Sequence, residues 1–385
     1  MTYRRAVIPA LAGGLLLTAL LWWAGASTDA LRLPGAQGVL GAQAAGDLER
    51  WLLPWSYESP ESVALGGGNV VAVGGGRYVG LYATAMQIRF AAVFVFFVPG
   101  ALLLVRRLPP VHGRVPATLL AVWAWGLVAT TLAVTVSAPW LIASQGHGSY
   151  RFLPQLAGTI TSGQQIAVVT GLVAAVAAVL VARVTVRGTG PLPREAVPVR
   201  ASVWAATAGT LVVAFSLVVL SYESVAAELQ TAFAGSGMFG EPGDLLREWL
   251  LLGGWAGPAG TPVGHWLLVR AADALLLAVV WCALRWLPGL LVRVTFPAMA
   301  VGAVCATVIG LLASQLLRMV TDGTDPRYGV VQRAAGLGGG VPAALTCGLV
   351  AGVVAAVTLR VAGGGVAKGD GAAAVEVPAG SAQQA

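Results

Sequence analysis

Charged side chains are scarce in this 385-residue sequence. Asp, Glu, Lys and Arg make up 10% of the residues and apolar residues 57%, whereas an ordinary soluble domain has about 25% charged residues. A chain with so little charge cannot cover a water-exposed surface, which excludes a water-soluble enzyme. Intrinsic disorder is also excluded, because it requires low hydrophobicity and high charge. The composition therefore indicates a protein whose main solvent is lipid.

Residues and motifs typical of catalysis are equally sparse. The cysteines Cys282, Cys305 and Cys347 all fall in apolar segments without a C-x-x-C spacing, so we expect neither a disulfide framework nor a redox or metal site. The sequence contains no G-x-S-x-G, H-E-x-x-H or Walker motif. We therefore expect no enzymatic activity, no metal and no cofactor.

Eight long apolar runs dominate the chain instead. A helix needs about 20 apolar residues to cross a hydrocarbon core, and continuous apolar character favours helices over the alternating strands of a membrane barrel. The runs are residues 6–25, 86–105, 116–137, 164–184, 202–221, 266–284, 297–317 and 341–360. The expected fold is an all-α polytopic membrane protein with eight transmembrane helices.

The first run also has features of a signal peptide. Arg4 and Arg5 precede it, and residues 24–26 (Ala-Gly-Ala) match an A-x-A cleavage site before Ser27. Cleavage at about Ala26 would leave seven spans. We favour retention, because the repeat described below matches this run to an internal span that cannot be a cleaved signal.

The charged residues are sorted by side. With the amino terminus inside, most arginines fall in the inner segments and most carboxylates in the outer loops, as the positive-inside rule requires. The expected location is a bacterial-type cell membrane with both termini cytoplasmic. The net charge of +7 then reflects topology and attraction to anionic lipid, and no nucleic-acid partner is expected.

Similar residues recur in the same order in the two halves of the chain. The matched sets are Gly46-Asp47-Leu48 with Gly243-Asp244-Leu245, Arg89 with Arg270, Pro116 with Pro297, and Gly171-Leu172-Val173-Ala174 with Gly348-Leu349-Val350-Ala351. An even number of spans per unit makes such a repeat parallel, related by an axis along the membrane normal. We expect a tandem duplication of a four-helix unit, with residues 1–200 and 201–362 as the repeats and 363–385 as a disordered tail.

The outer loops predict two short amphipathic helices, at residues 46–55 and 244–252. Their apolar side chains recur at helical spacing, and Trp51, Trp55 and Trp249 are expected as anchors at the membrane interface. A sugar- or lipid-binding role for these tryptophans is the alternative.

Residues 66–82 form a glycine-rich insert that has no counterpart in the second unit. Two pieces rich in β-favouring residues, 70–73 and 78–82, flank three glycines, which predicts a small β-hairpin. A phosphate-binding loop is disfavoured, because the segment lacks a P-loop lysine.

Arg270 and Asp273 are the clearest ionisable pair at membrane depth. They are three residues apart and therefore share a helix face. Charges at this depth usually face a bundle interior or a water-filled cavity, which suggests a substrate or proton site; the alternative is a structural ion pair with a snorkelling arginine. The matched Arg89 has Ala92, not a carboxylate, three residues later.

Small residues predict close helix packing in two spans. Gly348 and Gly352 form a G-x-x-x-G motif, which Gly171 and Ala175 echo. We expect these faces to lie at the interface between the two halves.

These features favour a permease-like protein for an unidentified small-molecule solute. The alternative is a non-catalytic membrane scaffold, or a subunit of a larger complex. The expected partners are the lipid bilayer and either another membrane protein or a second copy of the chain. An enzyme acting on lipid-linked substrates would require the outer-loop carboxylates Asp47, Glu49, Asp244 and Glu248 to meet.

Overall fold

The computed structural model describes residues 3–58, 75–110, 114–145, 151–186, 198–231, 240–255, 262–292, 294–321 and 333–363. Within these ranges the ordered elements are helices, and the one β feature is an isolated bridge between Tyr222 and Trp255. Eight of the helices are long and apolar enough to cross a membrane. The all-α class and the expected number of spans are therefore confirmed.

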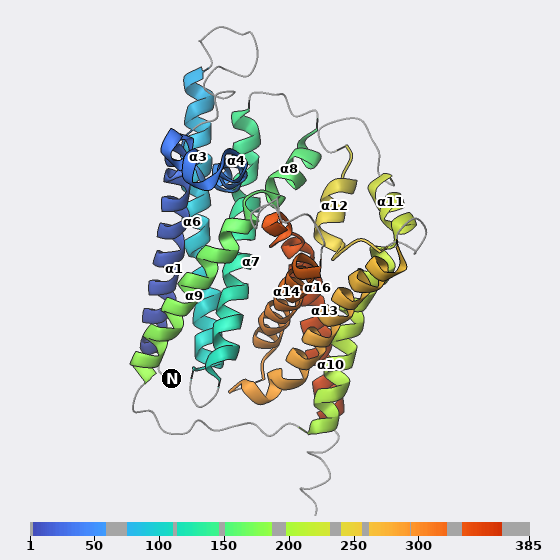
Figure 1. The fold of residues 1–385 in the computed structure, drawn as a ribbon. Coiled ribbons are helices and arrows are strands. Elements are labelled where there is room, and N and C mark those ends of the chain that lie inside the picture. Colours follow the sequence, from blue (N-terminus) through green and yellow to red (C-terminus); the bar gives the residue numbers. More distant parts are fainter. Residues whose placement is uncertain are drawn as a thin grey trace, which may run out of the picture.

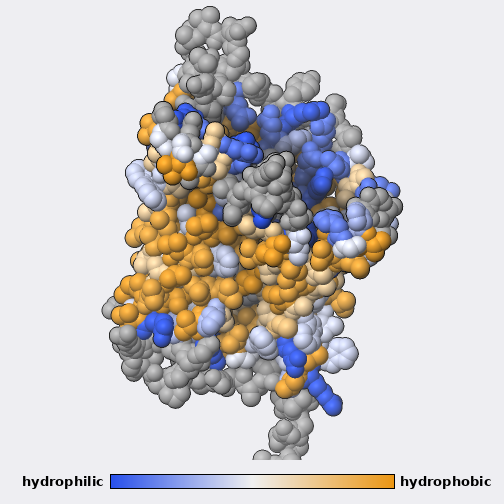
Figure 2. All heavy atoms as spheres, in the orientation of Figure 1, coloured by the Kyte–Doolittle hydropathy of each residue, from blue (hydrophilic) through white to orange (hydrophobic). Residues whose placement is uncertain are grey.

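The eight long helices coincide with the eight apolar runs. They are α1 (Tyr3–Ala26), α6 (Gly75–Arg107), α7 (Val115–Ser144), α9 (Gln164–Val186), α10 (Val199–Ala214, continued by the π-helical turn η2, Phe215–Leu220), α13 (Val263–Leu290), α14 (Phe296–Thr321) and α16 (Val341–Gly363). Figure 2 shows a belt of apolar side chains across the middle of the molecule and polar side chains towards its two ends. An apolar belt between two polar ends is the distribution expected of a protein that crosses a hydrocarbon core with water on both sides.

The long helices form two groups of four that lie side by side (Figure 1). In the first group α1 and α7 both contact α6 and α9, and in the second α10 and α14 both contact α13 and α16. The groups meet mainly where α7 packs against α14, with smaller contributions from α6 and α16. We call this α7–α14 contact region the seam.

Short helices gather at one end of the bundle, which we call the outer end because the predicted orientation places it outside (Figure 1). They are α2 (Thr28–Arg32), α3 (Pro34–Leu40), α4 (Ala42–Leu52, continued by the 3-10 turn η1, Leu53–Trp55), α8 (Phe152–Thr161), α11 (Glu223–Thr231), α12 (Gly243–Leu250) and the 3-10 turn η4 (Ala334–Gly336). The two expected outer helices correspond to α4 with η1 and to α12. Because α8 contacts α12, the outer layer joins the two groups.

The β-hairpin expected in residues 66–82 is wrong for its second strand. Residues 78–82 belong to the first turns of α6, while residues 70–73 lie outside the described ranges. Extending an existing helix adds one hydrogen bond per residue fixed, which outweighs the local strand preference. Tyr82 then turns inward, where it is 5% exposed and donates its hydroxyl to the Ser56 carbonyl at 2.8 Å. The tail from residue 364 onward also lies outside the described ranges.

The G-x-x-x-G motif of α16 packs directly against the backbone of α14. A Cβ at Gly348 would lie 2.7 Å from the Val304 Cα, and one at Gly352 would lie 2.6 Å from the Ala300 Cα. Both distances are shorter than any ordinary carbon–carbon contact. Glycine is therefore required for the close approach of these two helices.

The corresponding face of α9 packs against α7. A Cβ at Gly171 would lie 3.5 Å from the Trp123 side chain, and Ala175 is completely buried. Both small-residue faces thus pack inside their own group of four helices. The expectation that they lie between the halves is wrong, because the seam is formed by other faces of α7 and α14.

Candidate functional site

Asp273 lies between two arginines at the outer end of the bundle. Its Oδ2 is 3.0 Å from Nη1 of Arg270, one turn earlier on α13, and its Oδ1 accepts a hydrogen bond from Nη2 of Arg318 on α14. Asp273 is 4% exposed. The pair expected from the sequence is therefore a three-residue cluster with two guanidinium groups and one carboxylate. We call Arg270, Asp273 and Arg318 the Asp273 cluster.

Arg270 is held by aromatic rings and does not snorkel freely into water. Its Cζ lies 3.9 Å from the ring centre of Trp255 and 5.9 Å from that of Trp266. Its Nη2 donates to the Gly254 carbonyl at 3.2 Å, and the side chain is 12% exposed. Stacking on an aromatic face stabilises a cation most when the pair is shielded from water. Arg270 thus joins α13 to the segment that follows α12.

That segment is fixed in turn by the outer end of α10. The Trp255 amide donates to the Ser221 carbonyl at 2.7 Å, and the Glu223 amide donates to the Trp255 carbonyl at 2.9 Å. Just before these bonds, the π-helical turn lets Ser216 donate its hydroxyl to the Leu250 carbonyl. Single π-helical turns are frequent at functional sites. Here the turn connects α10 to the tryptophan on which Arg270 stacks.

Arg89, matched with Arg270 in the sequence, lies on α6 in the first group and is completely buried. Its Nε donates to the Ser137 hydroxyl at 2.9 Å, and its Nη1 donates to the Pro54 carbonyl. Its Cζ lies 5.7 Å from the Trp55 ring centre. Within the described residues no carboxylate pairs with it, in contrast to Arg270. Arg89 therefore carries a positive charge that is stabilised by dipoles and an aromatic face.

Trp55 is placed inside the protein and not at the membrane interface. It is 1% exposed, and its Nε1 donates to the Gly163 carbonyl at 3.0 Å. The expectation of an interfacial anchor is wrong for this residue, because Arg89 and the start of α9 enclose it. Trp249 is half-buried against the core, and its carbonyl accepts a hydrogen bond from Thr346.

Two spacings in the sequence point to further residues of the site. Ser137 and Arg318, which bind Arg89 and Asp273 respectively, stand 181 positions apart, the same offset as Arg89 and Arg270. Trp55 and Trp255 also correspond, since each follows the residue whose carbonyl binds the arginine of its half. These pairs were not predicted because each member lies 15 or more residues along the chain from the residue that it contacts.

Trp51 lies beside a second feature, a pocket of 390 Å³ at the outer end. We call it the outer pocket; it is lined by Asp47, Arg50, Trp51, Thr161, Ser162, Gly163, Gln165 and Ala335. Asp47 and Arg50 are paired at 3.0 Å. Gln165 donates its amide to the Ala335 carbonyl at 2.6 Å, which ties the first group to the residues before α16. The outer pocket thus combines an aromatic ring, an ion pair and a side-chain amide from the first half of the chain with Ala335 from the second.

Glu248 stands apart from the other outer carboxylates in its titration. Burial of its carboxyl group on α12 raises its pKa to about 7, although the adjacent Arg247 acts to lower the pKa. A carboxyl group with this pKa changes its charge near neutral pH. It is therefore the clearest source of pH dependence in the outer layer.

The outer carboxylates do not assemble into a catalytic group in the described residues. Glu49 pairs with Arg32 at 2.8 Å, and Asp244 accepts a hydrogen bond from Gln230 at 2.7 Å. Each is bound within its own loop, as is Asp47. No group of three His, Cys, Asp or Glu side chains in the described ranges is arranged to hold a metal ion.

At the outer end, Arg89 and Arg270 therefore hold two tryptophan-bearing segments against the long helices. The eight spans identify the chain as a multi-pass membrane protein. A scan against protein-family models, a search of curated proteins and a search of solved structures each found no match to this chain.

Proposed function

We propose that the protein is a permease-like membrane protein for an unidentified solute, built as a parallel duplication of a four-helix unit. The observation that carries this proposal is the same order of helix neighbours in the two groups, which meet along one seam. Two such units, related by an axis along the membrane normal, create a pathway or binding site between them in known transporter folds.

The arginine–tryptophan contacts support the duplication. In each half an arginine of the second span stacks on a tryptophan and binds the carbonyl just before it. That tryptophan in turn meets the outer end of the first span: a Cβ at Gly25 would lie 1.9 Å from the Trp55 carbonyl oxygen, and Ser221 accepts the Trp255 amide. Two unrelated four-helix units would not be expected to repeat this set of contacts.

The Asp273 cluster is the proposed solute or proton site. A carboxylate buried among cations in a membrane protein is costly and usually marks a pathway for substrate or protons. The cluster joins α13 to α14, and α14 is the helix that packs against α7 elsewhere along its length. The first group has Ala92 where Asp273 would be, so only the second half would carry the titrating group.

Flux measurements on liposomes containing the purified protein test this proposal. Labelled sugars, amino acids, nucleosides and organic anions would be offered with and without a proton gradient. We expect uptake of at least one class above empty liposomes, and loss of that uptake in Asp273→Asn. Glu228→Gln, which removes an exposed carboxylate on α11, is the matched control and should retain it. No uptake of any class would contradict transport, and unchanged uptake in Asp273→Asn would remove the cluster as the site.

A non-catalytic subunit of a larger membrane complex is the second candidate. The packing of the seam favours it: where α7 meets α14, the buried Cys305 thiol donates to the Ala121 carbonyl at 3.3 Å, among apolar side chains. An apolar seam offers no path to a polar solute. Co-purification after extraction in a mild detergent tests this candidate, which predicts a stoichiometric partner and no flux.

A further inference from the structure

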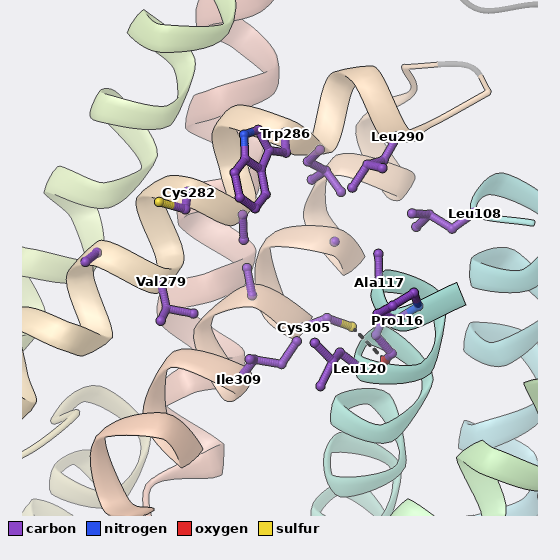
Figure 3. Close-up of a pocket in the computed structure, with 16 residues that line it drawn as sticks. Leu108, Pro116, Ala117, Leu120, Val279, Cys282, Trp286, Leu290, Cys305 and Ile309 are labelled. Atoms are coloured by element: carbon purple, nitrogen blue, oxygen red, sulfur yellow. Dashed lines mark hydrogen bonds between the residues drawn. The ribbon is translucent and has the colours of Figure 1, made fainter. Parts of the chain in front are cut away.

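A cavity of 610 Å³ lies where α13 and α14 meet the first group at α7 (Figure 3). Its volume is within the range of about 300–1,000 Å³ that ligand pockets occupy. The lining side chains are apolar, among them Leu120 of α7, Ala283 of α13 and Ile309 of α14. Apolar cavities do not hold ordered water. A molecule that fills this cavity must therefore be hydrocarbon-like.

The cavity is accessible from the surface of the helix bundle. Trp286 and Leu120, on opposite walls in Figure 3, are 64% and 37% exposed. These side chains belong to apolar spans and so face the lipid, which gives acyl chains a direct path into the cavity.

Two arginines, Arg107 and Arg114, lie next to the end of the cavity that is nearest the inner end of the bundle. Arg107 precedes the lining residue Leu108, and its carbonyl accepts the Val292 amide at 3.1 Å. Arg114 donates to the Gly289 carbonyl at 3.3 Å, next to the lining residue Leu290. These bonds join the first and second groups at the inner end of the seam.

We propose that this cavity is a binding site for one anionic glycerophospholipid of the inner leaflet. An acyl chain fills the apolar cavity, and the phosphate group lies beside Arg107. An apolar cavity with two arginines beside its inner end is complementary to an anionic lipid, because the acyl chain requires the apolar walls and the phosphate group is attracted by the arginines. The site is independent of the transport proposal, because binding requires no movement of a solute.

Native mass spectrometry of the purified protein tests this site. Phosphatidylglycerol and phosphatidylcholine with identical acyl chains would be added in turn to the protein in detergent. We expect one phosphatidylglycerol to bind more tightly than phosphatidylcholine. Arg107→Gln should reduce that preference about fivefold, the usual effect of one basic residue near an anionic lipid surface. Arg200→Gln at the exposed start of α10 is the control and should leave it unchanged.

Filling the cavity should remove the bound lipid. Ala283→Phe places a ring where the acyl chain lies, and excluding two methylene groups weakens binding by at least about tenfold. Val176→Phe adds a ring on the lipid-facing side of α9, away from the cavity, and should have no effect. Equal binding of the two lipids, or undiminished binding in Ala283→Phe, would overturn the proposal.

Photo-crosslinking of the unaltered protein tests the site without depending on the folding of any variant. Phosphatidylglycerol with a photoactivatable group on its acyl chain would be crosslinked to wild-type protein in liposomes and the products mapped by peptide mass. The expected crosslinks are on the stretches 278–290 and 302–309, which line the cavity. Crosslinks spread evenly over all lipid-facing helices would show ordinary surrounding lipid and would also overturn the proposal.

Discussion

Adding one methyl group at Gly348 tests the contact on which the second group of helices depends. The new Cβ would lie 2.7 Å from the Val304 Cα and 3.1 Å from the Val304 amide nitrogen. These are backbone atoms, so no rotamer change can relieve the clash, and α16 must move away from α14. Optimal carbon–carbon contacts are about 3.5–4.0 Å, which requires a separation of about 1 Å.

The expected destabilisation follows from two opposing effects. Overpacking in a rigid core costs about 1–3 kcal/mol, and opening a gap of about 1 Å forfeits up to about half of each affected dispersion contact. Replacing Gly by Ala inside a helix stabilises the helix by about 1 kcal/mol, which offsets part of this cost. We therefore expect Gly348→Ala to lower the free energy of unfolding by about 1–2 kcal/mol.

Gly171→Ala is the matched control at the corresponding place on α9. Its Cβ would lie 3.5 Å from the Trp123 side chain, an ordinary contact, so the gain in helix propensity remains and stability should be equal or higher. Thermal unfolding of both variants in the same detergent, followed by tryptophan fluorescence, measures the difference. Equal melting temperatures for the two variants would refute the argument that α16 lies against the α14 backbone.

Two further predictions concern charge. Asp273→Asn leaves Arg270 and Arg318 facing each other without a carboxylate between them. Breaking a buried ion pair costs about 3–5 kcal/mol. Because the Arg318 side chain is 36% exposed, we expect the free energy of unfolding to fall by about 3 kcal/mol, the lower end of this range. At roughly 2 °C per kcal/mol for a large domain, this loss corresponds to a fall in Tm of about 6 °C. The double variant Asp273→Asn/Arg318→Gln should recover part of that Tm, because it removes one of the two facing cations. An unchanged Tm in Asp273→Asn would contradict the role of the cluster in stability. Because the pKa of Glu248 is raised to about 7 from its ordinary 4.5, the folded protein binds the proton more tightly, so stability should fall as pH rises from about 4.5 to about 7 and then level off. Glu248→Gln should remove this slope and stabilise the protein at pH 8 by about 1–2 kcal/mol, after allowance for partial exposure, as melting curves at pH 5 and pH 8 would show.

The spans could be predicted from the sequence because the bilayer imposes one requirement on every residue that crosses it. Backbone groups in hydrocarbon must bond within the segment, so a long apolar run such as residues 341–360 predicts a helix without knowledge of its neighbours. The start of α6 did not follow this rule, because residues 78–82 lie at the outer end and their conformation depends on the helix that they extend.

The tertiary partners were less accessible to sequence reasoning. Asp273 and Arg270 share a helix face and were paired from their spacing, but Arg318 lies 45 residues away on another helix. The partner of Gly348 could not be chosen either, since a small-residue face fits any helix that approaches closely. Both contacts depend on the order in which helices surround one another, and hydropathy does not encode that order.

The polar ties across the seam have a consequence for biosynthesis. Arg114 is 8% exposed and binds Gly289, and Gln165 binds Ala335, so residues made early in translation depend on partners made much later. The first four spans must therefore remain in the membrane without these two hydrogen bonds until the later segments are made. A chain truncated after α10 would present an incomplete surface to the cell's quality-control proteases, and the two halves are expected to reach their final stability only together.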